Sequence, residues 1–384
     1  MTDHDGTEKA KAGRIEASCT VRGSINHDEY FHVSHIVRPG ETLSSSGHES
    51  RVGGKGANQA VAIALAGGTA RFYGTIGKDG LWIRERMMRF GIDVEGIVVS
   101  EELTGRAIIQ VDEQGENSII LFPGANYSDL HEQSFARHPD GPGWFPTSTH
   151  LLLQNEIPLP ATYYALHSAK AQGAVVVVNP SPLPEEEEMR RFPWEKVDWL
   201  VVNEAEARGV YGAVARRGMD EVSSQRQSQK KASSPASMST RELISSLSAE
   251  PAFVSTNIVC TLGADGVLAF VPALHRRDNS LEAQEFIQLP AAKLLEGVKD
   301  TTGAGDCFAG YFVCGLMEFA ESAAGRRGED GGTEGGGKRE MREKDLERIL
   351  KVAVQAAGMC CERRGTIDSY PSRSEVEARM AASV

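Results

Sequence analysis

A short segment with paired glycines and aspartates, Asp300-Thr301-Thr302-Gly303-Ala304-Gly305-Asp306, stands just before an apolar run that begins at Cys307. Apolar residues recur at helical spacing in that run, which predicts a helix from about Gly303. Glycines at its start would let a ligand approach the backbone, and the free N–H groups and dipole of the first turn favour an anion. Asp306 would lie among these donors as a carboxylate able to accept a proton. This combination suits the transfer of a phosphoryl group to a hydroxyl.

Taken alone, the segment could equally be a glycine turn with Asp306 as a helix-capping residue, so its interpretation depends on the rest of the chain. A second glycine run, Gly53-Gly54-Lys55-Gly56-Ala57-Asn58, also opens an alanine-rich helical stretch. Lys55 and Asn58 are three residues apart and therefore share one face of its first turn. Recognition of a diol or triol needs several polar partners of this kind, although the glycines could instead serve only close packing.

The elements that must position these residues follow a β/α rhythm. Largely apolar runs separated by helical stretches predict parallel strands at 14–23, 150–154, 174–178, 198–202 and 257–261, the first more polar than the others. Ligands bind open α/β sheets at the carboxyl ends of the strands. Polar clusters follow these strands, so we expect them to meet at one edge: Asn26 and Asp28, Asn155 and Glu156, Asn179, Asn203 and Glu206, and residues 261–266. At Asn26 an Asx-type turn is the alternative.

Alternating polar and apolar residues interrupt this rhythm at about 27–50 and 97–125, and predict a small second sheet that acts as a lid. Two further stretches, at about 212–240 and 322–342, are polar and of low complexity, so we expect disordered surface insertions there. Residues 1–13 are expected to form a disordered tail. This leaves one domain over residues 14–384.

Composition narrows the classes of partner. A chain of 384 residues that is 40% hydrophobic can bury a large core, and its net charge of −12 argues against nucleic acids and anionic membranes as partners. The six cysteines show no Cys-x-x-Cys spacing, and the polar N-terminal stretch does not resemble a secretory signal. No run reaches the roughly 18 apolar residues of a membrane span. We therefore expect reduced thiols in a cytoplasmic protein, with the nucleus as a second location.

In order and spacing, these motifs resemble those of the PfkB carbohydrate kinases. The Asn-x-Asp motif at Asn26 and the Gly-Gly-Lys-Gly-Ala-Asn motif at Gly53 are most similar to the ribokinases within that family. The resemblance covers residues 14–371 outside the two insertions. It implies an α/β fold, a three-layer α/β/α sandwich with a mostly parallel central sheet and a small β-sheet lid. It also implies ATP-dependent phosphorylation of the 5-hydroxyl of D-ribose, with Mg²⁺ and K⁺ as cofactors and a homodimer formed through the lid.

The resemblance further implies a role for each matching position. Asp306 looks like the catalytic base, and the N–H groups of Gly303, Ala304, Gly305 and Asp306 look like an anion hole. The implied sugar contacts are Asn26, Asp28, Gly54, Lys55, Asn58, Glu156 and Asp306. The implied nucleotide contacts are Asn203, Thr261, Leu262, Gly263, Ala264, Asp265, Gly266, Gly305 and Val354. Glu206 is implied to organise Mg²⁺ indirectly, and the implied monovalent-cation ligands are Asp300, Thr302, Cys360, Arg363, Gly365 and Ser369.

Some alternatives stay open. Val354 stands where this family often has Asn or His beside the adenine, and the small residues of 351–360 suit either a purine slot or tight helix packing. A kinase for another sugar or nucleoside, and a catalytically silent sugar-binding or regulatory protein, are rival functions. The first strand is not followed by a Gly-x-Gly-x-x-Gly motif, which argues against a dehydrogenase.

Overall fold

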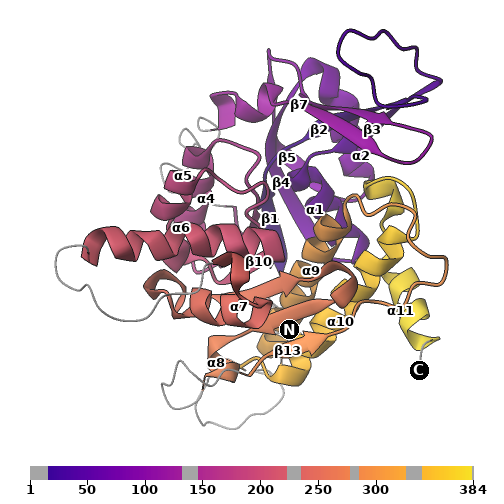
Figure 1. The fold of residues 1–384 in the computed structure, drawn as a ribbon. Helices are drawn as coiled ribbons and strands as arrows, with labels where there is room; N and C mark the ends of the chain where they lie inside the picture. Colours follow the sequence, from indigo (N-terminus) through magenta and orange to yellow (C-terminus); the bar gives the residue numbers. More distant parts are fainter. Residues whose placement is uncertain (1–15, 132–145, 223–234, 277–284, 326–339, 383–384) are drawn as a thin grey trace, which may run out of the picture.

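A sheet of nine strands runs through the body of the protein in the order β13-β12-β11-β10-β9-β8-β1-β4-β5 (Figure 1). The structure, a computed structural model, describes residues 16–131, 146–222, 235–276, 285–325 and 340–382. From β11 to β5 neighbouring strands are parallel, whereas β12 and β13 add an antiparallel edge. The strands are β1 Ser18–Arg22, β4 Thr69–Gly77, β5 Asp93–Ser100, β8 His150–Leu153, β9 Val175–Val178, β10 Trp199–Asn203, β11 Asn257–Thr261, β12 Val267–Phe270 and β13 Ile287–Leu289.

Helices cover both faces of this sheet because alternate strand residues enter two separate apolar cores. Leu152 and Val177 join one core with α1, α2, α9, α10 and α11, while Leu151 and Val176 join the other with α4, α5, α6 and α7. This is the predicted three-layer sandwich. The helices are α1 Lys55–Leu65, α2 Leu81–Arg89, α4 Leu159–Ala171, α5 Glu186–Arg191, α6 Glu204–Val222, α7 Thr240–Ala249, α8 Pro272–His275, α9 Ala304–Gly325, α10 Glu343–Cys361 and α11 Arg373–Ala381. None of the described helices has the length and hydropathy needed to cross a bilayer.

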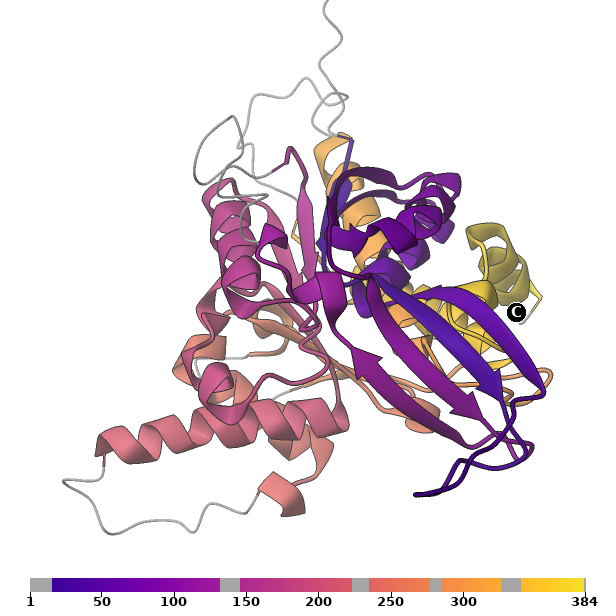
Figure 2. The same ribbon diagram turned by 90° about the horizontal axis from the view of Figure 1, so that it is seen from above.

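A second sheet of four strands, in the order β3-β2-β6-β7, projects from the body as the predicted lid (Figure 2). Its strands are β2 Asn26–His32, β3 Gly47–Gly53, β6 Gly105–Val111 and β7 Asn117–Phe122. The expected boundary at residue 97 is wrong, because Ile97 to Ser100 pair with β4 in the body sheet. The lid also extends beyond residue 50, since β3 continues to Gly53.

The bounds of the two predicted insertions are also wrong. Helix α6 continues to Val222, and Pro235–Ser237 and the start of α7 at Thr240 are ordered as well. The second expected insertion overlaps the end of α9 at 322–325. Residues 1–15, 223–234 and 326–339, on which the remaining predictions of disorder fall, lie outside the described residues.

Helices α1 and α9 touch backbone to backbone, and this contact fixes where their first turns meet. A Cβ placed on Gly310 of α9 would lie 2.8 Å from the carbonyl oxygen of Gln59 and 2.9 Å from the amide nitrogen of Ile63 in α1. Both distances are shorter than a side chain tolerates, so only glycine allows this approach. The two glycine-rich motifs of the sequence therefore open helices that lie in contact.

We predict that Gly310→Ala lowers the free energy of unfolding by about 1–3 kcal/mol, the usual cost of overpacking a core. Urea unfolding followed by circular dichroism measures this change. Gly212→Ala is the matched control, because Gly212 also lies within a helix but has no atom within 4 Å of its Cβ position. We expect it to stabilise the protein by about 0.5–1 kcal/mol, as Gly-to-Ala changes do at open helical sites. Equal stability of the two variants would contradict the close helix contact.

Candidate active site

Polar residues from several strands and two helix starts meet at the carboxyl edge of the body sheet. Strands β11, β10, β9, β8 and β1 lie side by side in this order, and each pair of neighbours is parallel. Their carboxyl ends therefore lie at the same edge of the sheet. Asn58 of α1, Asn179 after β9 and Asp306 of α9 come together there through hydrogen bonds. Of the polar residues expected to meet at this edge, Asn179 thus lies in one hydrogen-bond network with the starts of α1 and α9.

Asp306 is the central group of the site, and only 6% of it is exposed. Its Oδ2 accepts a hydrogen bond from Nδ2 of Asn58 at 3.0 Å, and its Oδ1 accepts one from Nε2 of Gln59 at 2.9 Å. Gln59 is itself held, because its Oε1 accepts from Nε2 of Gln154 at 2.6 Å. Two amide donors thus orient a buried carboxylate and leave it with further acceptor capacity.

The backbone before Asp306 forms an open nest of N–H groups. Gly303 has a φ of +77°, the left-handed conformation that favours glycine, and α9 begins at the next residue. The N–H of Ala304 donates to the carbonyl of Thr301 at 3.2 Å, whereas those of Gly305 and Asp306 have no acceptor in the described part of the chain. A Cβ on Gly305 would meet nothing within 4 Å. The helix start therefore presents free donors to open space, as an anion site requires.

The charged side chains around Asp306 shift one another's pKa values. Asp306 raises the pKa of Lys55 above its ordinary value, and Glu156 acts in the same direction. Burial raises the pKa of Glu156, and burial together with the charges of Glu156 and Asp306 raises the pKa of Asp28 to about 7. Oδ1 of Asp28 is buried and has no partner among the described residues. An unpaired buried acceptor of this kind indicates a ligand with donor groups.

Glycines and neighbouring amides place the remaining predicted sugar contacts. Gly54 has a φ of +85°, and a Cβ there would lie 2.8 Å from the backbone nitrogen of Asn26. The side-chain oxygen of Asn26 accepts from Nδ2 of Asn126 at 2.8 Å. Glu156 accepts from the hydroxyl of Ser24 at 2.5 Å and from the backbone nitrogen of Lys55 at 2.9 Å. Asp28, Lys55, Asn58 and Glu156 therefore interact with Asp306, and Gly54 and Asn26 lie against each other beside Lys55.

The predicted nucleotide positions are ordered, and some have structural roles of their own. Asn203 and Glu206 form a capping box at the start of α6: each backbone N–H donates to the other's side chain, at 2.9 and 2.8 Å. In the loop after Thr261, Gly263 and Gly266 have φ values of +58° and +92°. Residues 263–265 are exposed, and Val354 is half-buried on α10. A capping box holds Asn203 and Glu206 in place without any ligand, so their hydrogen bonds by themselves do not indicate a nucleotide.

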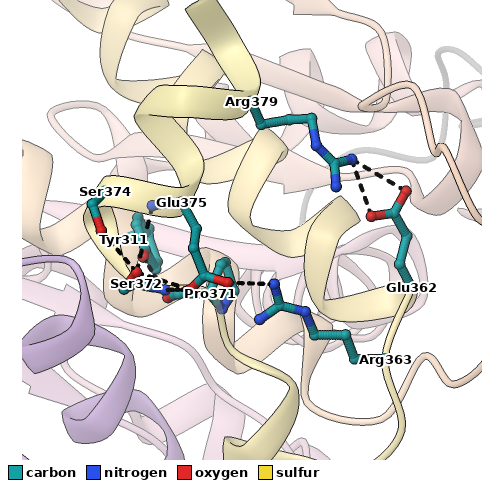
Figure 3. Close-up of polar contacts among 8 residues, drawn as sticks. All are labelled: Tyr311, Glu362, Arg363, Pro371, Ser372, Ser374, Glu375 and Arg379. Atoms are coloured by element: carbon teal, nitrogen blue, oxygen red, sulfur yellow. Dashed lines mark hydrogen bonds and ion pairs between the residues drawn. The ribbon is translucent and has the colours of Figure 1, made fainter. Parts of the chain in front are cut away.

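The predicted monovalent-cation ligands gather where the loop after α10 meets the turn before α9. Oδ1 of Asp300 accepts from the amide of Thr302, and its Oδ2 accepts from the amide of Gly365, both at 2.9 Å. The hydroxyl of Ser369 lies 3.0 Å from Sγ of Cys360. The side chain of Arg363 points away to Glu375, at 2.6 Å, which leaves only its carbonyl for the site (Figure 3). A carboxylate with hydroxyl and carbonyl oxygens is a donor set that fits a hard alkali cation.

The described ranges contain no group of three His, Cys, Asp or Glu residues that could hold a metal ion. Mg²⁺ commonly keeps several water ligands and binds through one or two carboxylates and substrate phosphates. The residues of this edge, with Glu206 near Lys55, are compatible with that indirect mode.

Several residues at the site were not predicted to contribute to it. Gln59 follows Asn58 in the glycine-rich motif, and its position at the start of α1 was the available signal. Ser24 fixes Glu156, and Asn126 holds both the backbone of Ile25 and the side chain of Asn26. Asn126 lies where the chain returns from the lid, so only the folded chain brings it to this place.

The geometry combines a proton acceptor, an anion nest and a polar hollow for a hydroxylated molecule. A model of the pfkB family of carbohydrate kinases matches residues 17–373. Ribokinase of Haemophilus influenzae is 31% identical over 94% of this chain and 97% of its own, and deoxyribokinase of Salmonella typhi is 27% identical over 92% and 95%. The crystal structure of ribokinase from Cryptococcus neoformans var. grubii serotype A in complex with ADP is 38% identical, with a TM-score of 0.71 over 95% of this chain and 99% of that one. The chain belongs to the pfkB family of carbohydrate kinases.

Proposed function

We propose that this kinase is a ribokinase, which transfers the γ-phosphoryl group of ATP to the 5-hydroxyl of D-ribose. The observation that carries the proposal is the buried Asp306 carboxylate, held by Asn58 and Gln59 between a free N–H nest and the group of Asp28, Lys55 and Glu156. The similarity to the H. influenzae and Cryptococcus ribokinases supports the choice of acceptor and of ATP.

The sugar hydroxyl attacks the γ-phosphate in line, and Asp306 accepts its proton. The N–H groups of Gly305 and Asp306, at the positive end of the α9 dipole, stabilise the negative charge that develops on the transferred group. Asn58 and Gln59 keep the carboxylate aimed at the acceptor. The lid covers the acceptor and excludes water, which would otherwise hydrolyse ATP.

The same proposal covers the cofactors. ATP lies along the predicted nucleotide positions, Asn203, the loop 261–266 and Val354, with its phosphates toward Gly305. Glu206 would help to hold Mg²⁺, and the ion would supply further positive charge for the transfer. A monovalent ion such as K⁺ at Asp300 and Ser369 would fix the turn that leads into α9 without taking part in the reaction.

We also propose that two copies associate through their lids. Ile108 of β6 and Ile120 of β7 are partners in the ladder, 36% and 59% exposed, on the face opposite Asp28. Strand β7 is an edge strand, so its outer backbone groups are open to pairing as well. An exposed apolar face beside an open edge suits a symmetric contact with a second copy.

The activity test measures ADP release with D-ribose, 2-deoxyribose, fructose or adenosine as the acceptor. We expect the highest kcat/KM with D-ribose, because the polar group around Asp28 can pair with every hydroxyl and an absent one would leave a buried group unpaired. Preference for another acceptor would replace ribose in the proposal. A lack of turnover with all four would favour a silent binding protein.

Asp306→Asn serves as the control in that assay. It should lower kcat by at least about 100-fold, the usual contribution of a general base. Binding of ribose and ATP should persist, because asparagine keeps the size of the side chain. Near-normal turnover would remove Asp306 from its role.

The KM for ribose should depend on pH. Ionised Asp28 accepts hydrogen bonds from sugar hydroxyls, and its pKa in the free protein is about 7. As the pH falls through 7, Asp28 takes up a proton and binding weakens, by up to about tenfold per pH unit. Steady-state kinetics between pH 6 and pH 8.5 measure the effect, with the KM for ATP as internal control. Asp28→Asn should show a high KM without this pH dependence, and a parallel pH profile of that variant would contradict the assignment.

Ile120→Glu should convert the dimer to a monomer, because it places a charge in the proposed apolar contact. Sedimentation velocity at micromolar concentration measures the change. Glu113→Ala, at the exposed turn between β6 and β7, is the control and should leave the dimer intact. A monomeric wild-type protein would refute the lid contact.

A further inference from the structure

The lid face that carries Asp28 extends beyond the sugar-binding group. Side chains alternate along a strand, so Asp28 and Tyr30 of β2 point to the same face. Arg51 of β3 is the ladder partner of Asp28 and shares that face. Tyr30 and Arg51 therefore lie on the inner side of the lid, next to the groups proposed to bind the acceptor.

Arg51 lies between the ring of Tyr30 and the loop after α10. Its guanidinium carbon is 4.9 Å from the centroid of the Tyr30 ring, and its other side pairs with Glu49. A Cβ placed on Gly365 would overlap Nη1 of Arg51, so the guanidinium covers the backbone at that point. The hydroxyl of Tyr30 interacts with the side chain of Thr366. Two lid residues thus contact two consecutive residues of one body loop.

That loop supports the start of α9 directly. The amide of Gly365 donates to Oδ2 of Asp300 at 2.9 Å. A Cβ on Gly303 would lie 2.6 Å from Cγ2 of Thr366 and 2.8 Å from the hydroxyl of Tyr370, so the loop packs against the glycine that precedes the helix. Any displacement of the loop at Gly365 must therefore change the turn from Asp300 to Gly303.

The C-terminal end of this loop is hydrogen-bonded to α9, so a displacement of the loop would also act on that helix. The hydroxyl of Tyr311, within α9, donates to the carbonyl of Pro371 at 2.7 Å (Figure 3). On the lid side, a cavity of about 340 Å³ lies between β3, α2 and the loop, lined by Arg51, Trp82 and Asp368 among others. The loop is thus hydrogen-bonded to α9 at its C-terminal end, and a cavity lies between the loop and the lid on its other side.

We propose that Arg51 and Tyr30 are positioning residues through which the lid sets the geometry of the N–H nest at Gly303–Asp306. The inference rests on the proposed function, since it assigns a step to the same site. Arg51 covers Gly365, and Tyr30 interacts with Thr366. Through these contacts the lid holds the loop, and the loop holds Asp300 and Gly303 in the arrangement that receives the phosphoryl group. Without the Arg51 side chain this turn is less constrained, so the saturated rate falls while the acceptor still binds.

Arg51→Ala should lower kcat for ribose phosphorylation by about tenfold, the effect of losing roughly one polar contact in the transition state. The dissociation constant of ribose without nucleotide should change less than twofold when titration calorimetry is run at pH 8.5, because Asp28, whose pKa Arg51 lowers, is then mostly ionised in both proteins. Arg51→Lys and Tyr30→Phe should show intermediate losses of kcat, because each keeps one of the two contacts in part. Arg38→Ala, in the exposed lid loop, is the matched control and should behave as wild type. A merely structural role in the lid would weaken ribose binding and leave the saturated rate unchanged.

Hydrogen–deuterium exchange in the ligand-free protein tests the contact without reference to activity. Amides of residues 300–306 and 365–370 should exchange faster in Arg51→Ala than in wild type, and at the wild-type rate in Arg38→Ala. Unchanged exchange together with a kcat within twofold of wild type would overturn the inference. If the wild-type protein phosphorylates none of the acceptors, the proposed function fails, while the exchange result still decides whether the lid constrains the loop.

Discussion

The burial of the Asp306 carboxylate is the constraint on which the rest of the site depends. A carboxylate that is 6% exposed is costly unless hydrogen bonds replace its water. Asn58 and Gln59 supply those bonds from the first turn of α1. Their reach depends on the close contact of α1 with α9, which Gly310 permits. A glycine one turn beyond the reacting end of the helix thus determines whether the carboxylate can be held at the acceptor site.

The lid is connected to this site through the backbone itself. Strand β2 begins at Asn26, shortly after β1. Strand β3 ends at Gly53, and α1 begins at Lys55, with only Gly54 between them. Strands β2 and β3 of the lid therefore start and end among the groups proposed to bind the acceptor. The position of the lid is therefore tied to these groups, and Arg51 of β3 also lies against Gly365 in the loop that supports the start of α9.

The sequence was most informative where a local pattern has one physical solution. Apolar runs such as 257–261 could only be buried strands, and glycines before apolar helices marked the two helix starts. The prediction of disorder at 212–222, which was made from composition, is wrong. Residues with good helix propensity extend α6 to Val222. The role of Gln59 could not be foreseen, because its two donors and one acceptor are assigned only when Asp306, Asn179 and Gln154 arrive from distant strands and helices. Likewise, pairing with β4 places Ile97 in the body sheet, and no local pattern reveals that partner.

The distribution of charge fits the proposal that the two ligands occupy opposite sides of Asp306. Glu156 and Asp306 both act on the ammonium group of Lys55, and burial together with their negative charges raises the pKa of Asp28, although Arg51 lowers it. A neutral polyol relieves this repulsion, because its hydroxyls donate to carboxylates without adding charge, whereas an anionic acceptor would increase it. The N–H groups at Gly305 and Asp306 have the opposite preference and attract phosphate. Asp306 lies at the boundary between these two environments, which is the position that the proposed base would need to take a proton from one ligand as it attacks the other.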